Sequence, residues 1–230
     1  MTRSNKVLII GASRGLGMAL AQEWLSRGWE VVATVRSANT PLHRLEQVFG
    51  NRLCIEQMDV AEPYDTDSLA RRLAHHDFDV LYVNAGIALG SADRADEVST
   101  EDFTRLMVTN ALSPIRIVER LREKVKEQGT IAIMSSSLGS VALNESGGWE
   151  VYRASKAALN MLMRSFAARH ASASWGLALI DPGWVRTEMG GANATLSVEE
   201  SIPGIVNQIA ASSGRPGLRY YNYRGETLPW

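Results

Sequence analysis

Short hydrophobic runs recur along the chain, and each is closed by glycine or polar residues. A run of three to five apolar residues between turn signals is typical of a strand buried on both faces of a parallel sheet. Seven such runs predict strands, at residues 7–10, 31–35, 53–55, 80–83, 131–134, 177–180 and 218–221.

Between these runs, apolar residues return every three or four positions, which predicts helices. In the first, Leu16, Leu20 and Trp24 share a face until Arg27 and Gly28 end the helix. Further helices are predicted over residues 41–50, 64–75, 100–126 with a break near Ser113-Pro114, 152–171 and 198–212, and a polar loop over 91–99. The alternation of strands and helices predicts one α/β domain over residues 1–230, a Rossmann-type doubly wound parallel sheet of about seven strands with helices on both faces.

Composition narrows the class of protein. A chain of 230 residues can bury one sizeable core, so no second domain is required. A net charge of −1 gives no electrostatic reason to bind nucleic acid or an anionic membrane. The apolar run between Lys6 and Gly11 is too short for a signal peptide or a membrane span, which favours a cytoplasmic protein.

The cysteine and histidine residues point to no further chemistry. Cys54 is the single cysteine and lies in an apolar run, so a buried, inert thiol is expected. The four histidines, His43, His75, His76 and His170, have no cysteine or carboxylate at metal-ligand spacing. No metal site is therefore predicted.

A glycine-rich turn, Gly11-Ala12-Ser13-Arg14-Gly15-Leu16-Gly17, joins the first predicted strand to the first helix. This order is typical of nucleotide binding, because main-chain N–H groups at a helix start can bind phosphate. The second strand ends at Arg36, where a carboxylate would select a ribose 2′-hydroxyl and an arginine favours a 2′-phosphate. Arg14 could reach the same phosphate, so the pair predicts NADP; two solvated loop arginines are the alternative.

Tyr152 and Lys156 stand four residues apart at the start of a predicted helix, and therefore share a face. A cation beside a phenol lowers the pKa of the phenol and assists proton transfer to a carbonyl oxygen. An amphipathic helix that carries the pair by chance is the alternative. Ser136 follows the fifth predicted strand, but no histidine or elbow motif accompanies it, which argues against a hydrolase.

As an ordered set, these motifs resemble the short-chain dehydrogenase/reductase family over nearly the whole chain. The resemblance rests on the glycine turn, Asp59, Asn84-Ala85-Gly86, Asn110, Ser136, Tyr152, Lys156 and Pro182-Gly183. Residues 135–140, 152–160, 181–191 and 225–230 are similar to the C-factor and sniffer-type carbonyl reductases.

The resemblance implies roles for individual residues. Ser136 would polarise the substrate carbonyl and Tyr152 would act as general acid, while Lys156 would lower the pKa of Tyr152 and bind the nicotinamide ribose. Asn110 would hold a water that links Lys156 to solvent; a buried asparagine that only bonds to the backbone is the alternative. The implied cofactor-binding residues are Gly11, Ser13, Arg14, Gly15, Leu16, Gly17, Arg36, Asp59, Val60, Asn84, Ala85, Gly86, Tyr152, Lys156, Pro182, Gly183, Val185 and Thr187.

Four residues beside the predicted catalytic segments, Leu138, Trp149, Trp184 and Met189, are expected to wall an apolar substrate pocket. Core packing is the alternative for the two tryptophans. The sixteen-residue spacing from Ser136 to Tyr152 is longer than is common in the family, which predicts an enlarged loop at the substrate side.

These features predict an NADP-dependent oxidoreductase that reduces aldehydes or ketones to alcohols by hydride transfer. The resemblance implies a small-molecule carbonyl substrate, and pairing into a homodimer or homotetramer through the helices that carry Asn110 and Tyr152. Two alternatives remain. One is a nucleotide-sensing or signalling protein with little catalysis, and the other is an oxidising dehydrogenase of secondary alcohols, against which Arg36 argues.

Overall fold

The computed structural model describes residues 4–90 and 93–230, and its strands form one seven-stranded sheet. The strands are β1 (Lys6–Ile10), β2 (Glu30–Val35), β3 (Leu53–Gln57), β4 (Phe78–Val83), β5 (Val125–Met134), β6 (Gly176–Asp181) and β7 (Gly217–Asn222). They lie in the order β3-β2-β1-β4-β5-β6-β7, and every neighbouring pair is parallel. The predicted fold class is therefore confirmed.

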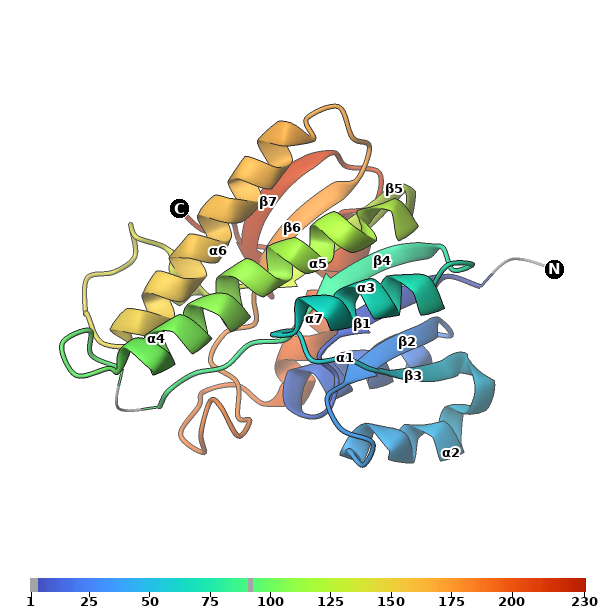
Figure 1. Cartoon of the computed structure of the whole chain (residues 1–230), viewed down its shortest axis with the longest axis horizontal. Helices are drawn as coiled ribbons and strands as arrows, with labels where there is room; N and C mark the ends of the chain where they lie inside the picture. The colour runs from blue at the N-terminus through green and yellow to red at the C-terminus, as the bar shows by residue number, and fades with distance from the viewer. Residues whose placement is uncertain (1–3, 91–92) are drawn as a thin grey trace.

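Helices cover both faces of this sheet. They are α1 (Gly15–Ser26), α2 (Glu46–Phe49), α3 (Pro63–Arg72), α4 (Thr100–Met107), α5 (Ser113–Leu121), α6 (Glu150–Arg169) and α7 (Val198–Ala211). Figure 1 shows α4, α5 and α6 in front of the sheet, with α1 and α7 behind it.

Strand β1 shows why the hydrophobic runs had no polar alternation. Val7 and Ile9 pack in the core that includes α1 and α7, whereas Leu8 and Ile10 pack in the core that includes α5 and α6. Successive side chains of a strand point to opposite faces, so a strand covered on both faces must be apolar at every position.

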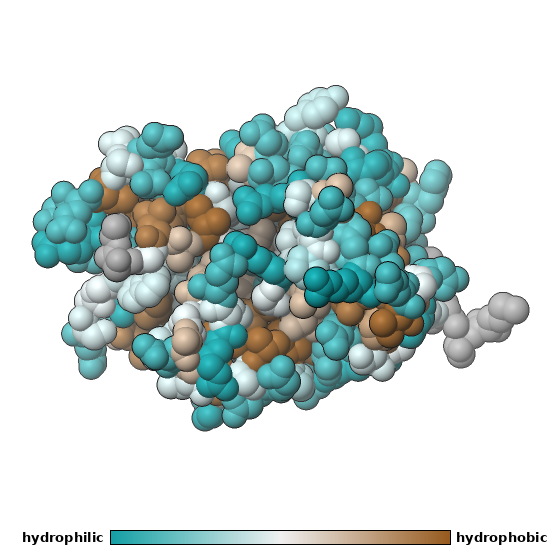
Figure 2. All heavy atoms as spheres, turned by 90° about the horizontal axis from the view of Figure 1, so that it is seen from below, coloured by the Kyte–Doolittle hydropathy of each residue, from teal (hydrophilic) through white to brown (hydrophobic). Residues whose placement is uncertain are grey.

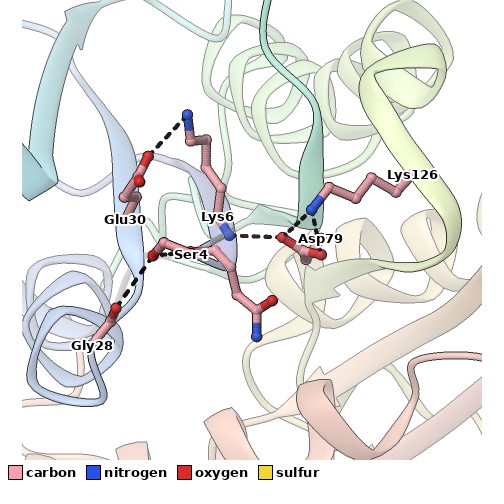
Figure 3. Close-up of polar contacts among 7 residues, drawn as sticks. Ser4, Lys6, Gly28, Glu30, Asp79 and Lys126 are labelled. Atoms are coloured by element: carbon pink, nitrogen blue, oxygen red, sulfur yellow. Dashed lines mark hydrogen bonds and ion pairs between the residues drawn. The ribbon is translucent and has the colours of Figure 1, made fainter. Parts of the chain in front are cut away.

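Polar contacts hold the amino ends of the central strands together, as Figure 3 shows. Asp79 on β4 accepts hydrogen bonds from the main-chain N–H of Lys6 and from the ammonium of Lys126, each at 2.7 Å. The ammonium of Lys6 also pairs with Glu30 at 3.0 Å. These contacts link β2, β1, β4 and β5 at the edge opposite to their carboxyl ends.

The carboxyl ends of β1 and β4 mark the point where the order of strands reverses. From β1 the chain runs outward to β2 and β3, and from β4 it runs outward through β5 to β7. Open parallel sheets bind ligands in the crevice beyond such a point. Gly11, Asn84 and Ser135 follow β1, β4 and β5 directly, so the predicted site motifs lie at this crevice.

The long helix predicted over residues 100–126 is interrupted earlier than expected. A π-helix, Val108–Leu112, joins α4 to α5 and contains Asn110. Pro114 is the second residue of α5, and the backbone is helical without a gap from α4 through the π-helix into α5. The proline therefore removes one helical N–H donor directly after the wider turn around Asn110.

Two other local predictions need correction. The helix predicted over residues 41–50 is a 3₁₀ helix, Pro41–Leu45, followed by the single turn of α2. The prediction that Cys54 is buried is wrong: its thiol side chain is exposed. Strand β3 lies at the edge of the sheet, and only Leu53 and Ile55 turn toward the core.

The predicted loop over residues 91–99 is only partly described, since residues 91 and 92 lie outside the described part. From Asp93 to Val98 the chain forms turns and irregular structure, as expected, before α4 begins at Thr100. Across residues 4–90 and 93–230, no helix combines the length and apolar character needed to cross a bilayer.

Candidate functional site

Ser136, Tyr152 and Lys156 come together from two elements at the crevice. Ser136 follows β5, and the other two lie one turn apart in the first half of α6. The Ser136 hydroxyl faces the Tyr152 phenol and acts to lower the pKa of that phenol. The Lys156 ammonium lies 5.8 Å from the centroid of the Tyr152 ring. The three residues that the sequence predicted as a set are therefore neighbours in space.

Three consecutive serines follow β5, and their contacts distinguish them. Ser135 is buried and donates its hydroxyl to the amide oxygen of Asn160 at 2.7 Å. Ser137 faces the carboxylate of Asp181 and acts against the burial that raises the pKa of that carboxylate. Among the three serines, Ser136 is the one whose hydroxyl affects the pKa of the Tyr152 phenol. The structure thus gives a physical reason to prefer Ser136 over its neighbours.

Burial governs the ionisation of both the lysine and the tyrosine. It lowers the pKa of Lys156 to about 8, and the ammonium donates to the main-chain oxygen of Met134 at 2.9 Å. Burial also raises the pKa of the Tyr152 phenol, and the charge of Asp181 raises it further. The expected lowering of the Tyr152 pKa by Lys156 is therefore not found in the protein chain by itself.

Asn110 is fully buried, and protein groups use its side-chain amide. The amide oxygen accepts from the N–H of Ile87 at 2.8 Å, and the amide nitrogen donates to the carbonyl of Ile87 at 2.9 Å and to Ser155 at 3.1 Å. A Cβ atom placed on Gly86 would lie 3.4 Å from Asn110 Oδ1 and 3.6 Å from Lys156 Nζ. Asn110 therefore ties the segment after β4 to α6, close to the lysine.

The glycine turn allows main chains to approach closely. A Cβ atom on Gly17 would lie only 2.1 Å from the carbonyl oxygen of Gly11, and that oxygen accepts from Asn84 Nδ2 at 2.8 Å. Helix α1 begins without a side-chain cap and without an acidic residue in its first turn. Its first N–H groups and the positive end of its dipole therefore suit an anionic group such as a pyrophosphate.

The loop after β6 lies opposite the glycine turn. A Cβ atom on Gly15 would meet Thr187 Cγ2 at 4.0 Å. Arg14 forms an exposed ion pair with Glu188 at 2.7 Å, whereas Arg36 is exposed at the end of β2. Any phosphate that binds Arg14 would thus compete with the Glu188 carboxylate.

A cavity of about 540 Å³ lies beside the segment that follows β3. Asp59 accepts from the N–H of Ala61 at 2.9 Å, and Ala61 lines the cavity. The remaining lining residues come from α4 and the π-helix: Thr100, Glu101, Thr104, Arg105, Val108 and Thr109. The cavity therefore lies beside Asp59, one of the predicted cofactor-binding residues, rather than beside Tyr152.

The predicted pocket residues are mostly on the surface. Trp149, Trp184 and Met189 are 42%, 53% and 49% exposed, which excludes core packing as the role of the two tryptophans. The ring of Trp149 meets the Tyr152 ring edge-on, with centroids 6.0 Å apart. Figure 2 shows hydrophobic residues gathered at the left of the view, the side on which the loop before α6 lies in Figure 1.

Two contacts to the catalytic segments were missed at the sequence level. Asp93 is 3% exposed and accepts hydrogen bonds from the N–H of Tyr152. Tyr220 on β7 donates its hydroxyl to the carbonyl of Ser136. Asp93 occurs in an acidic stretch typical of solvated loops, and Tyr220 in an ordinary hydrophobic run, so no local signal marked either.

The comparisons with known proteins agree with this geometry. Residues 5–196 match the family model of the short chain dehydrogenases. A protein of Burkholderia multivorans described as a short-chain dehydrogenase/reductase, solved with bound NADP, is 53% identical with a TM-score of 0.97, over 99% of this chain and 100% of that one.

Two further relatives carry more specific descriptions. A carbonyl reductase from Pseudomonas aeruginosa PAO1, solved in complex with NADP, is 39% identical with a TM-score of 0.93, over 99% of this chain and 100% of that chain. The C-signal of Myxococcus xanthus is 36% identical over 159 residues, which cover 66% of this chain and 92% of that protein.

Proposed function

The chain belongs to the short chain dehydrogenase family, and we propose that it is an NADP-dependent reductase that converts the carbonyl group of aldehydes or ketones to an alcohol. The observation that carries the proposal is the convergence of Ser136, Tyr152 and Lys156 at the carboxyl end of the sheet, beside the glycine turn. The similar Burkholderia and Pseudomonas structures, both solved with NADP, support the cofactor.

The residues around the crevice fit an NADP molecule. The glycine turn and the uncapped start of α1 would hold the pyrophosphate, and the exposed Arg36 would bind the 2′-phosphate with Arg14. Lys156 would bind the nicotinamide ribose, and Val185 and Thr187 would hold the carboxamide, as the family resemblance implies. When bound, the reduced cofactor supplies the hydride that a carbonyl carbon accepts.

Side chains of the protein then stabilise the negative charge that develops on the carbonyl oxygen. Ser136 donates a hydrogen bond to that oxygen, and Tyr152 transfers its phenolic proton to it as negative charge develops. Both interactions are stronger in the transition state than in the ground state, which is the condition for catalysis. General acid help of this kind contributes about 10²–10⁴ in rate.

Lys156 stabilises the phenolate that remains on Tyr152. With a pKa of about 8, the buried ammonium is mostly protonated at neutral pH. The amide of Asn110 is engaged with Ile87 and Ser155, so its contribution is to hold α6 against the segment after β4. A relay water beside Lys156 would then need main-chain atoms of the π-helix as its partners.

The substrate side favours small carbonyl compounds with apolar substituents. The segment between Thr187 and Val198, where the family often places a substrate lid, is short. Trp149, Trp184 and Met189 expose apolar surface near the catalytic segments. Broad specificity for aldehydes and ketones follows, and a strict preference for one bulky substrate would contradict it.

The proposal is tested by the absorbance of NADPH in the presence of aldehydes, diketones and quinones, with NADH in parallel. Wild type should turn over with NADPH, and Tyr152→Phe should lose most turnover while its NADPH affinity stays unchanged. Equal turnover by the two proteins would overturn the proton-transfer role. Saturable NADPH binding without turnover on any carbonyl would favour a nucleotide-sensing protein instead.

A self-paired assembly is also proposed, as a homodimer or homotetramer formed through α4, α5 and α6. Phe103, Leu112, Met161 and Leu162 expose apolar side chains on the helical segments that carry Asn110 and Tyr152. Sedimentation of wild type beside Met161→Glu tests this assembly. Wild type should associate and Met161→Glu should associate less, whereas a wild type that stays monomeric at all concentrations would contradict the proposal. The cytoplasmic location expected from the sequence stays a prediction.

A further inference from the structure

Asp93 connects the described segment before α4 to the start of α6. Its two carboxylate oxygens accept the main-chain N–H of Tyr152 at 3.2 and 3.1 Å. Its own carbonyl accepts the N–H of Val151 at 3.3 Å, and Glu150 returns a bond by accepting the N–H of Ala95 at 3.0 Å. The two segments are thus bonded in both directions at the residue that carries the phenol.

Helix α6 has no cap of its own that could replace this contact. The residue before it, Trp149, has a left-handed backbone with φ of 51° and makes no side-chain cap hydrogen bond. In an ordinary N-cap, a side-chain oxygen accepts the N–H of the second or third helical residue. Tyr152 is the third residue of α6, and Asp93 reaches it from 59 positions away in the chain.

The capping group is a buried carboxylate, and burying its charge costs free energy. An asparagine or serine could accept a hydrogen bond from the same N–H without placing a charge out of water. Burial raises the pKa of Asp93, although the hydrogen bonds from Tyr152 and Val151 act in the opposite direction. Its charge also contributes to the raised pKa of the Tyr152 phenol.

Few other charges face this group. Glu150 on α6 is exposed and acts on Asp93 in the same direction as burial. The adjacent Arg94 is turned to Asp96 at 2.8 Å, and both of these side chains are mostly exposed. The positive end of α6, a helix of 20 residues, is the main electrostatic partner of the carboxylate.

We propose that Asp93 is a positioning residue for Tyr152: it fixes the first turn of α6 so that the phenol meets the substrate oxygen. This inference rests on the proposed reductase function, because the phenol matters only if it transfers a proton. It adds to the Ser136, Tyr152 and Lys156 set a residue that touches neither substrate nor cofactor.

Three variants test whether Asp93 caps α6 at Tyr152. Asp93→Ala removes the cap, Asp93→Asn keeps one acceptor oxygen without the charge, and Asp96→Asn removes a nearby exposed carboxylate that does not bond to α6. We expect Asp93→Ala to lower kcat about ten- to hundredfold, because small displacements of a catalytic group have effects of this size. Its dissociation constant for NADPH should stay within about twofold of wild type.

Asp93→Asn keeps a hydrogen-bond acceptor for the N–H of Tyr152, so it should recover kcat to within about fivefold of wild type. Asp96→Asn should have the kcat of wild type, because its carboxylate does not bond to α6. Unchanged kcat in Asp93→Ala would overturn the positioning role, and so would a kcat of Asp93→Asn as low as that of Asp93→Ala.

Amide hydrogen exchange makes the test independent of turnover. The N–H of Tyr152 should exchange faster in Asp93→Ala than in wild type and Asp96→Asn, whether or not a substrate is found. If wild type shows no turnover, the reductase proposal fails, and faster exchange still supports the cap. If Asp93→Ala does not fold, Asp93→Asn decides the point, because a neutral amide oxygen is a weaker acceptor than a carboxylate. The N–H of Tyr152 should then exchange faster in Asp93→Asn than in Asp96→Asn, and equal rates would overturn the cap.

Discussion

The two sides of the crevice are built in different ways. On the side of β1 and α1, main-chain groups line the crevice. Gly17 packs on Gly11, and the start of α1 offers uncapped N–H groups. On the side of β5 and α6, buried polar side chains bond to one another, as Ser135 does to Asn160. The first side should therefore be sensitive to substitutions that add atoms to a glycine. The second should be sensitive to substitutions that remove a hydrogen-bonding group.

This difference suits what each side is proposed to bind. A pyrophosphate is bulky and anionic, so it needs close main-chain approach and a positive dipole rather than particular side chains. A reacting carbonyl oxygen needs donors at fixed places, and these must come from side chains held by their own partners. Substitutions on the two sides should therefore affect different measured quantities.

The largest effect should come from Ser136→Ala, which removes a donor from the side-chain half. Turnover should fall by about 10²–10³ because one transition-state donor is lost, while NADPH affinity stays unchanged. Ser137→Ala is the matched control, since that hydroxyl faces Asp181 instead of the phenol. Steady-state kinetics of both variants decide the point, and equal losses would refute the assignment of Ser136.

Arg36→Asp tests the exposed cation that is proposed to bind the 2′-phosphate on the side of β1 and α1. A charge-assisted bond to the 2′-phosphate contributes about 1.5–3 kcal/mol, so NADPH affinity should fall about ten- to hundredfold while NADH affinity is spared. Fluorescence titration with both nucleotides measures this. Arg14→Ala should have the smaller effect, because Glu188 already competes for that guanidinium. An unchanged preference in Arg36→Asp would contradict the assignment.

Gly17→Ala adds one atom where the main chains meet. The new Cβ would lie 2.1 Å from the Gly11 oxygen, so the free energy of unfolding should drop by about 1–3 kcal/mol and NADPH binding should weaken with it. Gly15→Ala is the control, because its Cβ would have no neighbour closer than 4.0 Å. Its positive φ still costs about 1 kcal/mol. Urea denaturation of both variants should rank them in that order.

The pH dependence of turnover probes the buried lysine. The ammonium of Lys156 loses its proton as the pH rises through about 8, and the phenolate of Tyr152 then lacks its cation. Carbonyl reduction should fall above that pH, by about tenfold for each further unit. Lys156→Arg keeps its charge at all these pH values, so its residual rate should show no such limb. A wild-type rate that stays level through about pH 9 would contradict the role of Lys156.

The order of elements and the position of the crevice could be predicted because they depend on local signals. The strand run 7–10, the glycine turn and the helix after it follow one another in the sequence, and the structure has them in that order. Tyr152 and Lys156 share a face because a helix has a fixed period. Such patterns involve residues a few positions apart, which is the range that periodicity covers.

Contacts between segments that are distant in the sequence could not be predicted from local patterns. The exposure of Cys54 depends on β3 lying at the edge of the sheet, which the run 53–55 does not reveal. The choice among the three serines after β5 needs the partners that each hydroxyl meets. The bonds of Asn110 to Ile87 and Ser155 likewise join segments that lie far apart in the sequence.

The sequence by itself determined the parallel α/β architecture, the glycine turn and the shared helical face of Tyr152 and Lys156, because each depends on spacing along a short segment. Only the tertiary structure decided that Asp93 caps the helix of Tyr152 and that burial raises the pKa of the phenol. Burial and capping depend on which distant groups fold against a side chain. Those groups are specified by the whole packing of the sheet and its helices, and no local pattern contains them.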